Sequence, residues 1–114
     1  MIGIDIVSIE RIENALKKYD KKFLERFLQD EEISLIKKSQ TAAGFWAAKE
    51  AIAKALGCGI GKELNFHDIT IKKRDNGSPY FILNENIKRE FKITSTALSI
   101  SHDGGFAIAV AVIM

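Results

Sequence analysis

The sequence contains one cysteine, Cys58, and two histidines in 114 residues. A single cysteine cannot form an intramolecular disulfide, and the chain has no cysteine–histidine set at the spacing of a zinc site. It also lacks an apolar run long enough to span a bilayer, and no signal or transit peptide is recognisable. These absences predict a cytoplasmic protein that makes no membrane contact.

An excess of charge of one sign is also missing. The 17 lysines and arginines nearly balance the 15 aspartates and glutamates, which leaves a formal net charge of +2. A domain that binds nucleic acid usually carries a stronger positive balance, so nucleic acid is not an expected partner. No repeat, linker or low-complexity segment divides the chain. We therefore expect a single globular domain over residues 1–114.

The clearest helix signal runs from Thr41, the expected N-cap, to Leu56, through an alanine-rich segment. At 100° per residue, one narrow stripe of this helix faces the core: Phe45, Ala48, Ile52 and Leu56. Glu50 and Lys54 lie on the opposite face, one turn apart. Such a pair is commonly a solvated ion pair that contributes a few tenths of a kcal/mol. The alternative is a charged functional face.

A glycine-rich loop follows this helix, with Gly57, Gly59 and Gly61 in close succession. Gly57 ends the helix, and the backbone N–H groups of the loop could bind an anion. The loop lacks the spacing and the final Ser or Thr of a Walker A motif. A simple helix stop is the more common role of such glycines.

Asp5 is unexpected in the apolar strand at the N-terminus, where Ile2, Ile4 and Ile6 share one face. A carboxylate there is unfavourable unless it is paired, hydrogen-bonded, bound to a cation or exposed on a half-solvated strand. Mg²⁺ takes one or two protein carboxylates and fills its octahedron with water and phosphate oxygens. Asp5 and Glu50 together meet that requirement.

Apolar spacing predicts three short helices between residues 9 and 38, preceded by the capping residues Ser8, Asp20 and Asp30. Basic residues follow one flank of the first two helices: Arg11, Lys18 and Lys22. Most such residues form a solvated face. The alternative is a docking strip for an acidic partner.

The second half of the chain is predicted to form mainly strands. Residues 69–73 and 80–83 predict a hairpin, with a turn through Asn76-Gly-Ser-Pro79. A short helix is expected near residues 84–91. The strands on either side of Asp103-Gly-Gly form a second hairpin, and the apolar run 106–113 predicts a central strand covered on both faces. The predicted fold is α+β, with a mostly antiparallel sheet packed against a long central helix and several short helices.

Three segments carry a family resemblance. They are Gly3-Ile-Asp-Ile-Val, Trp46-Ala-Ala-Lys-Glu-Ala-Ile-Ala-Lys-Ala-Leu-Gly and Ser99-Ile-Ser-His. In this order and spacing they resemble the holo-acyl-carrier-protein synthase family of small bacterial 4′-phosphopantetheinyl transferases. The resemblance covers nearly the whole chain and implies the fold of that family.

The family transfers 4′-phosphopantetheine from coenzyme A to a serine hydroxyl of acyl carrier protein, releases adenosine 3′,5′-bisphosphate and serves fatty acid biosynthesis. The resemblance implies Mg²⁺ ligands at Asp5 and Glu50. From the chemistry of the reaction, Glu50 is the candidate proton acceptor, directly or through a metal-bound water. It places Lys54 and His102 at the substrate phosphates. Asn76, Gly77 and Pro79 would lie near the adenine nucleotide.

The resemblance also implies a homotrimer whose active sites lie between neighbouring subunits. It further implies that the flank of the first helix that carries Arg11 docks the acidic carrier protein. Two other hypotheses remain at this point. One is a small RNA-binding or ribosome-associated module that uses the dispersed basic residues. The other is a scaffold trimer without catalysis, which leaves Asp5 unexplained.

Overall fold

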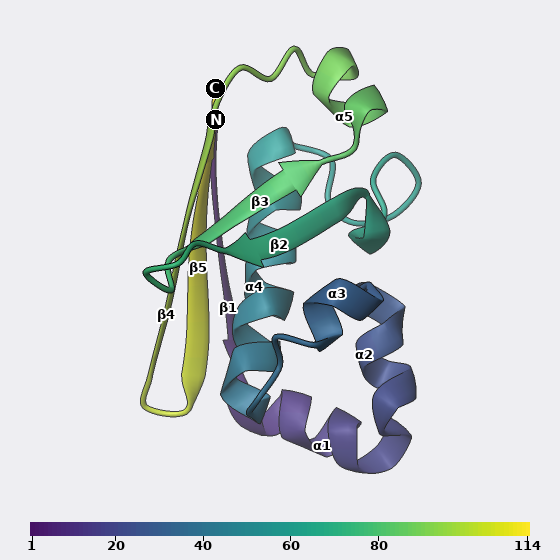
Figure 1. Cartoon of the computed structure of the whole chain (residues 1–114), viewed down its shortest axis with the longest axis vertical. Helices are drawn as coiled ribbons and strands as arrows, with labels where there is room; N and C mark the ends of the chain where they lie inside the picture. Colours follow the sequence, from purple (N-terminus) through teal and green to yellow (C-terminus); the bar gives the residue numbers. More distant parts are fainter.

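The computed structural model describes all residues from 1 to 114. Three strands form an antiparallel sheet in the order β1-β5-β4: β1 is Ile2–Ser8, β4 is Thr96–Asp103 and β5 is Phe106–Ile113. Gly104 and Gly105, both with positive φ, make the tight turn between β4 and β5. The central position expected for β5 is confirmed. Both chain ends lie together at one end of this sheet (Figure 1).

The long helix α4, Ser39–Leu56, packs against one face of the sheet. Small residues meet at this contact, because Ala107, Ala109 and Ala111 of β5 are fully buried beneath it. At Gly3 the approach is closest: a Cβ atom there would lie only 1.9 Å from the carbonyl oxygen of Ala51. The absence of a side chain at Gly3 is therefore what lets the helix backbone reach the strand.

The other face of the sheet is exposed and apolar. Ile2, Ile4 and Ile6 of β1 are 70%, 55% and 60% exposed, and Phe106 of β5 is 48% exposed. The expectation that β5 is covered on both faces is wrong for the isolated chain, because no element of the same chain packs on this side. An apolar surface of this kind marks a contact with another molecule.

Three helices pack beside the first half of α4: α1 is Ile9–Tyr19, α2 is Lys21–Phe27 and α3 is Asp30–Ile33 (Figure 1). Ser8 caps α1 as expected, accepting the N–H of Arg11 at 3.4 Å. Asp20 stands at the N-cap of α2 as expected, although its side chain makes no capping bond. The expected cap of the third helix is wrong, because Gln29, not Asp30, stands at the N-cap of α3.

The expected start of α4 at Thr41 is also wrong. The helix begins at Ser39 after an extended Lys38. The Ser39 hydroxyl donates to Glu13 Oε1 at 3.0 Å, which ties the first turn of α4 to α1. A tertiary contact, which local capping preference does not reveal, therefore sets this boundary.

The predicted hairpin forms a separate two-stranded antiparallel sheet of β2, Ile69–Lys73, and β3, Pro79–Leu83. The short 3₁₀ helix η1, Phe66–Asp68, precedes it and the helix α5, Glu85–Glu90, follows it. The buried residues of the hairpin and of α4 belong to one hydrophobic cluster of 25 residues. None of the helices combines the length and apolar character required to cross a membrane.

Substitution Gly3→Ala is expected to destabilise the protein by about 1–3 kcal/mol or more, because the new Cβ meets a backbone oxygen that cannot move without shifting α4. Gly44→Ala is the matched comparison. Its Cβ would lie 2.9 Å from a side-chain atom of Ile100, and alanine is favoured over glycine in a helix by about 1 kcal/mol.

Urea denaturation at one fixed protein concentration measures both variants. We expect the Gly44→Ala midpoint to lie closer to that of the unmodified protein. A Gly3→Ala protein as stable as the unmodified one would contradict the close approach of strand and helix.

Candidate active site

Asp5 and Lys54 meet where β1 runs beside the second half of α4. Lys54 Nζ lies 3.0 Å from Asp5 Oδ1, and the Asp5 side chain is only 16% exposed. Asp5 shares its strand face with Gly3, so the close approach of the helix brings the Asp5 carboxylate to the charged side of α4. Asp5 therefore does not point into open solvent, and an ion pair satisfies its charge in this structure.

Glu50 is the second carboxylate of this site. Its pKa is raised, first because the side chain is partly buried and second because Asp5 repels its negative charge; Lys54 and Arg11 act in the opposite direction. The two carboxylates predicted as metal ligands therefore lie close enough for their charges to interact. A hard cation would relieve their repulsion, and the donor set of two carboxylates fits Mg²⁺.

The carboxylates have no third protein ligand. No group of three or more histidine, cysteine, aspartate or glutamate side chains is arranged to hold a metal. A site with only two carboxylates leaves most coordination positions to water or to the oxygens of a substrate, which is how Mg²⁺ is held in enzymes that act on phosphates.

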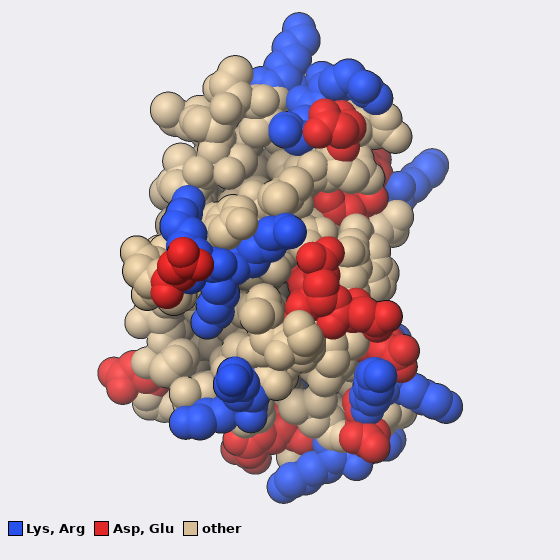
Figure 2. Space-filling view, viewed as in Figure 1, with Lys and Arg blue, Asp and Glu red and all other residues tan.

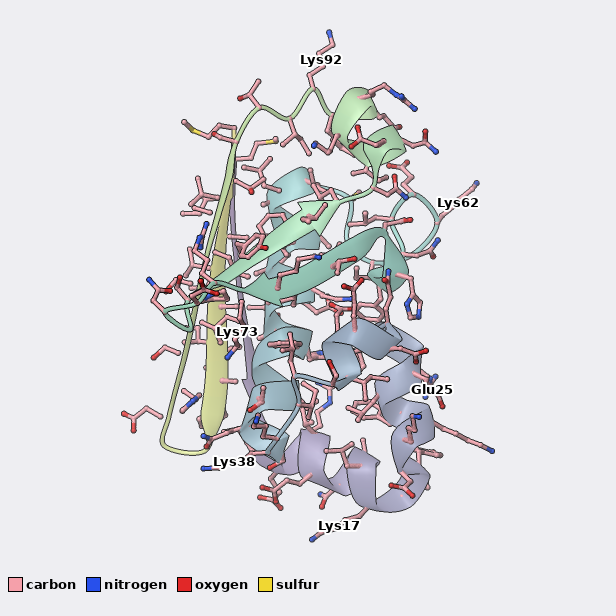
Figure 3. All side chains as sticks on the ribbon, in the orientation of Figure 1. Lys17, Glu25, Lys38, Lys62, Lys73 and Lys92 are labelled. Carbon is pink, nitrogen blue, oxygen red and sulfur yellow. The ribbon has the colours of Figure 1, made fainter.

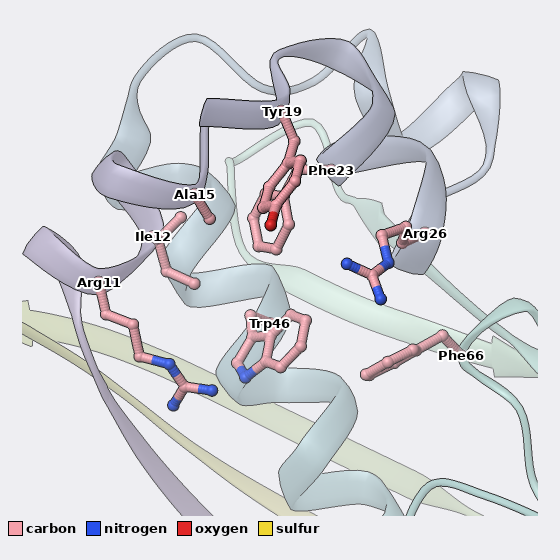
Figure 4. A pocket seen from close by; sticks show the side chains of 8 residues that line it. All are labelled: Arg11, Ile12, Ala15, Tyr19, Phe23, Arg26, Trp46 and Phe66. Atoms are coloured by element: carbon pink, nitrogen blue, oxygen red, sulfur yellow. The ribbon is translucent and has the colours of Figure 1, made fainter. Parts of the chain in front are cut away.

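A cavity of about 460 Å³ lies among the helices on the N-terminal side of the carboxylates along α4 (Figure 4), and neither Asp5 nor Glu50 lines it. Its apolar floor and walls come from α1, α2, α4 and η1: Ile12, Ala15, Tyr19, Phe23, Trp46 and Phe66. Two arginines, Arg11 and Arg26, complete the lining. The Arg11 guanidinium lies 5.9 Å from the centre of the Trp46 ring. Trp46 precedes Glu50 by one helical turn, so the two side chains lie on the same side of α4. Arg11 both lines the cavity and lowers the pKa of Glu50.

The basic residues predicted to bind a partner are only partly brought together. Arg11 lines the cavity, whereas Lys18 and Lys22 are exposed on α1 and α2 outside its lining. The sequence analysis missed Arg26. It follows Phe23 by three residues, so both lie on one face of a short helix, and that spacing was the signal available in the sequence.

A second, smaller cavity of about 150 Å³ lies at the opposite edge of the sheet. It brings together three predicted residues, Gly77, Pro79 and His102, with Lys73 and the first half of α4. Figure 3 shows Lys73 near the β2–β3 turn, and Figure 2 shows lysines and arginines gathered over this part of the surface. Asn76 is close in sequence but instead accepts the N–H of Ser78 at 3.0 Å within the turn.

The two groups of residues are separated within one chain. His102 lies on β4 and Asp5 on β1, the two edge strands on either side of β5. The edge strands are about 10 Å apart, since neighbouring strands are spaced by about 4.8 Å. Gly44 and Lys54, which mark the two sites on α4, are about 15 Å apart along the helix axis. His102 therefore does not join Asp5 and Glu50 in an isolated chain.

The glycine-rich loop ends α4, with Gly57 in the left-handed conformation. The N–H groups of its three glycines all donate to nearby backbone carbonyl oxygens. Gly57 donates to Lys54 at 3.0 Å, Gly59 to Ala53 at 3.4 Å and Gly61 to Leu64 at 2.8 Å. In this structure the loop therefore does not present the glycine N–H groups to an anion. The Lys62 side chain, near the tip of the loop, points away from the rest of the molecule (Figure 3).

A model of the 4′-phosphopantetheinyl transferase superfamily matches residues 1–111 of the chain. The chain belongs to this superfamily. The transferase is 62% identical over all of its length to the holo-[acyl-carrier-protein] synthase of Nitratiruptor sp., of which it covers 98%. The family resemblance and the expectation of a phosphopantetheinyl transferase enzyme are confirmed.

Solved structures agree with this assignment. The transferase superposes with a TM-score of 0.97 and 55% identity on the crystal structure of Helicobacter pylori holo-[acyl-carrier-protein] synthase in complex with coenzyme A, over 100% of both chains. The Bacillus anthracis enzyme in complex with CoA (3′,5′-ADP) gives a TM-score of 0.82 at 40% identity, over 98% of this chain and 93% of that one. The predicted α+β fold is confirmed.

Two variants of the transferase test the electrostatics of the carboxylate site in opposite directions. Asp5→Asn removes the charge that repels Glu50 and leaves Lys54 free, so the pKa of Glu50 should fall. Lys54→Gln removes a favourable charge, so the pKa of Glu50 should rise.

The measurement is the carboxyl ¹³C chemical shift of Glu50 against pH in the absence of divalent cations. Lys37→Gln, which removes an exposed lysine that forms no ion pair, is the control and should leave the pKa unchanged. Shifts of the same sign in the Asp5 and Lys54 variants would contradict the arrangement.

Proposed function

We propose that this transferase moves 4′-phosphopantetheine from coenzyme A to a serine hydroxyl of an apo acyl carrier protein, in a Mg²⁺-dependent reaction that supports fatty acid biosynthesis. The observation that carries the proposal is the meeting of Asp5, Glu50 and Lys54, one helical turn along α4 from a cavity with an apolar floor and two arginines. The coenzyme A complexes of the Helicobacter and Bacillus relatives support coenzyme A as the donor.

Asp5 and Glu50 would hold the Mg²⁺, which when bound supplies positive charge to the pyrophosphate of the donor. Lys54, an ammonium group already at the edge of the site, would bind a phosphate of coenzyme A. The serine oxygen bonds to the phosphorus that carries pantetheine, and the bond from that phosphorus to the leaving adenosine 3′,5′-bisphosphate breaks. Glu50 would accept the serine proton.

The carrier protein would dock at the cavity that contains Trp46. Arg11 and Arg26 attract an acidic surface, and the aromatic walls accept an apolar side chain at the centre of the contact. Because Glu50 lies one turn from Trp46 on α4, a carrier bound there presents its serine to the proton acceptor. The Coulombic part of this attraction weakens as salt rises.

The assembly proposed is a homotrimer with active sites between subunits. Two observations support it: the exposed isoleucines of β1 need a partner, and His102 lies on the far edge of the sheet from Asp5. In a cyclic trimer the β4 edge of one subunit can face the β1 edge of the next. Each site would then take Asp5, Glu50 and Lys54 from one subunit and His102, Gly77 and Pro79 from its neighbour.

The transfer assay tests the activity. The protein is incubated with coenzyme A, Mg²⁺ and apo acyl carrier protein, and the carrier is weighed by mass spectrometry. We expect a phosphopantetheine adduct that disappears with EDTA and is lost in Asp5→Ala and Glu50→Ala, with circular dichroism unchanged. Full activity in either variant would show that the metal is misplaced, and absence of an adduct with the unmodified protein would remove the proposed reaction.

Mixed assemblies test the shared site. Asp5→Ala and His102→Ala chains with different tags are co-expressed, and assemblies that carry both tags are purified. A trimer that carries both tags has one complete site among its three, so the purified mixture should exceed the mean activity of the two separate variants. A mixture of Asp5→Ala and Glu50→Ala is the control and should stay inactive, because both changes affect the same half-site. No gain in the first mixture would contradict a site between subunits.

A further inference from the structure

Lys49 and Glu32 are the only charged residues fully buried in the core. Neither belongs to the carboxylate site, although Lys49 is the residue before Glu50. Lys49 Nζ lies 3.0 Å from Glu32 Oε1, and both side chains have no exposed surface. Burial lowers the pKa of Lys49, which Glu32 partly offsets. Such a pair is expensive to desolvate, and apolar residues of similar volume often give equal or greater stability. Stability alone therefore does not account for it.

The hydrogen bonds of this pair join five elements: α2, α3, α4, η1 and β2. Lys49 Nζ, on α4, donates to the carbonyl oxygen of Phe27 at 2.7 Å and to that of Phe66 at 3.0 Å. Glu32, at the end of the chain's acidic run in α3, accepts the N–H of Ile71 in β2 at 2.9 Å and the N–H of Gln29 at 2.8 Å. All three Lys49 donors and both Glu32 oxygens are used, so each of these segments is held in a defined position relative to α4.

The two carbonyls that Lys49 binds belong to the aromatic cluster under the docking cavity. The Phe27 ring lies 5.1 Å from Trp46 and 6.0 Å from Phe66, and Trp46 lies 5.1 Å from Phe66. Phe23, the other phenylalanine that lines the cavity, contacts both Phe27 and Trp46 at 5.2 and 5.9 Å. Lys49 thus fixes the backbone on two sides of Trp46.

We propose that the buried Lys49–Glu32 pair is a positioning device that sets the spacing of Phe66, Phe27 and Trp46 and thereby the shape of the cavity that receives the carrier protein. This inference rests on the proposed docking of the carrier at that cavity. It assigns the pair to recognition of the acceptor, not to coenzyme A binding or proton transfer. A pair that serves only stability would leave acceptor recognition unchanged in any variant that folds.

Two variants test the proposal. Glu32→Gln with Lys49→Met removes both charges together, while the amide keeps an acceptor for Ile71 and offers donors to the freed carbonyls. Glu32→Asp keeps both charges and withdraws the carboxylate by one methylene. The matched control is the exposed ion pair of Lys72 and Glu31, whose charged groups lie 3.6 Å apart. Lys72 is next to Ile71 in sequence and Glu31 is next to Glu32. The control variant carries Lys72→Met and Glu31→Gln.

For every variant that is folded by circular dichroism, KM for the carrier, KM for coenzyme A and kcat are measured. We expect KM for the carrier to rise about tenfold in the double variant and about threefold in Glu32→Asp, with kcat and KM for coenzyme A within about twofold. The surface-pair control should match the unmodified protein in all three constants.

A second readout does not depend on activity. Trp46 is the only tryptophan, so its emission and its quenching by acrylamide report the aromatic cluster directly. We expect acrylamide to quench Trp46 more strongly in both core variants than in the unmodified protein. Quenching in the control variant should equal that of the unmodified protein. Unchanged quenching and unchanged KM for the carrier in a folded core variant would overturn the proposal. If the unmodified protein transfers nothing to the carrier, the proposed function fails, while the quenching still decides whether the pair shapes the cavity.

Discussion

The close contact between the backbone of β1 and the backbone of α4 is the constraint on which the candidate site depends. Gly3 leaves no room for a side chain against the Ala51 carbonyl, and the alanines of β5 continue the same tight contact along the sheet. Because strand side chains alternate, Asp5 lies on the same face as Gly3 and arrives at the charged side of the helix. Helix packing and carboxylate chemistry are thus consequences of one short segment.

Each side of α4 has a different task. Phe45, Ala48 and Ile52 fill the core, and Glu50 and Lys54 lie on the side of Asp5. Trp46 lines the cavity that also contains the two arginines, and Lys49 is buried against α3 and η1. A helix surrounded on nearly all sides needs small side chains to allow close neighbours. This explains the alanine-rich sequence better than helix propensity alone, since propensity does not require alanines at contacts with other elements.

The division of functional residues between two edges of the sheet has a physical origin in the size of the chain. A protein of 114 residues buries roughly two-thirds of its unfolded surface and forms one core, with little material left to enclose a substrate as large as a nucleotide. The cavities here are accordingly shallow parts of a larger surface. In the proposed trimer, repetition of the chain around an axis would supply the missing wall without added sequence.

Local patterns in the sequence determined the helices, the two hairpins, the turn glycines and the pairing of Asp5 with Glu50 as candidate ligands, because spacing and turn chemistry act over a few residues. The family motifs added the reaction class. Tertiary structure alone decided the start of α4 at Ser39, the exposure of one face of β5, the burial of Lys49 with Glu32 and the place of Arg26 in the cavity. These depend on which distant segments meet, and a charged residue in a sequence looks the same whether its partner is water or a carboxylate across the core.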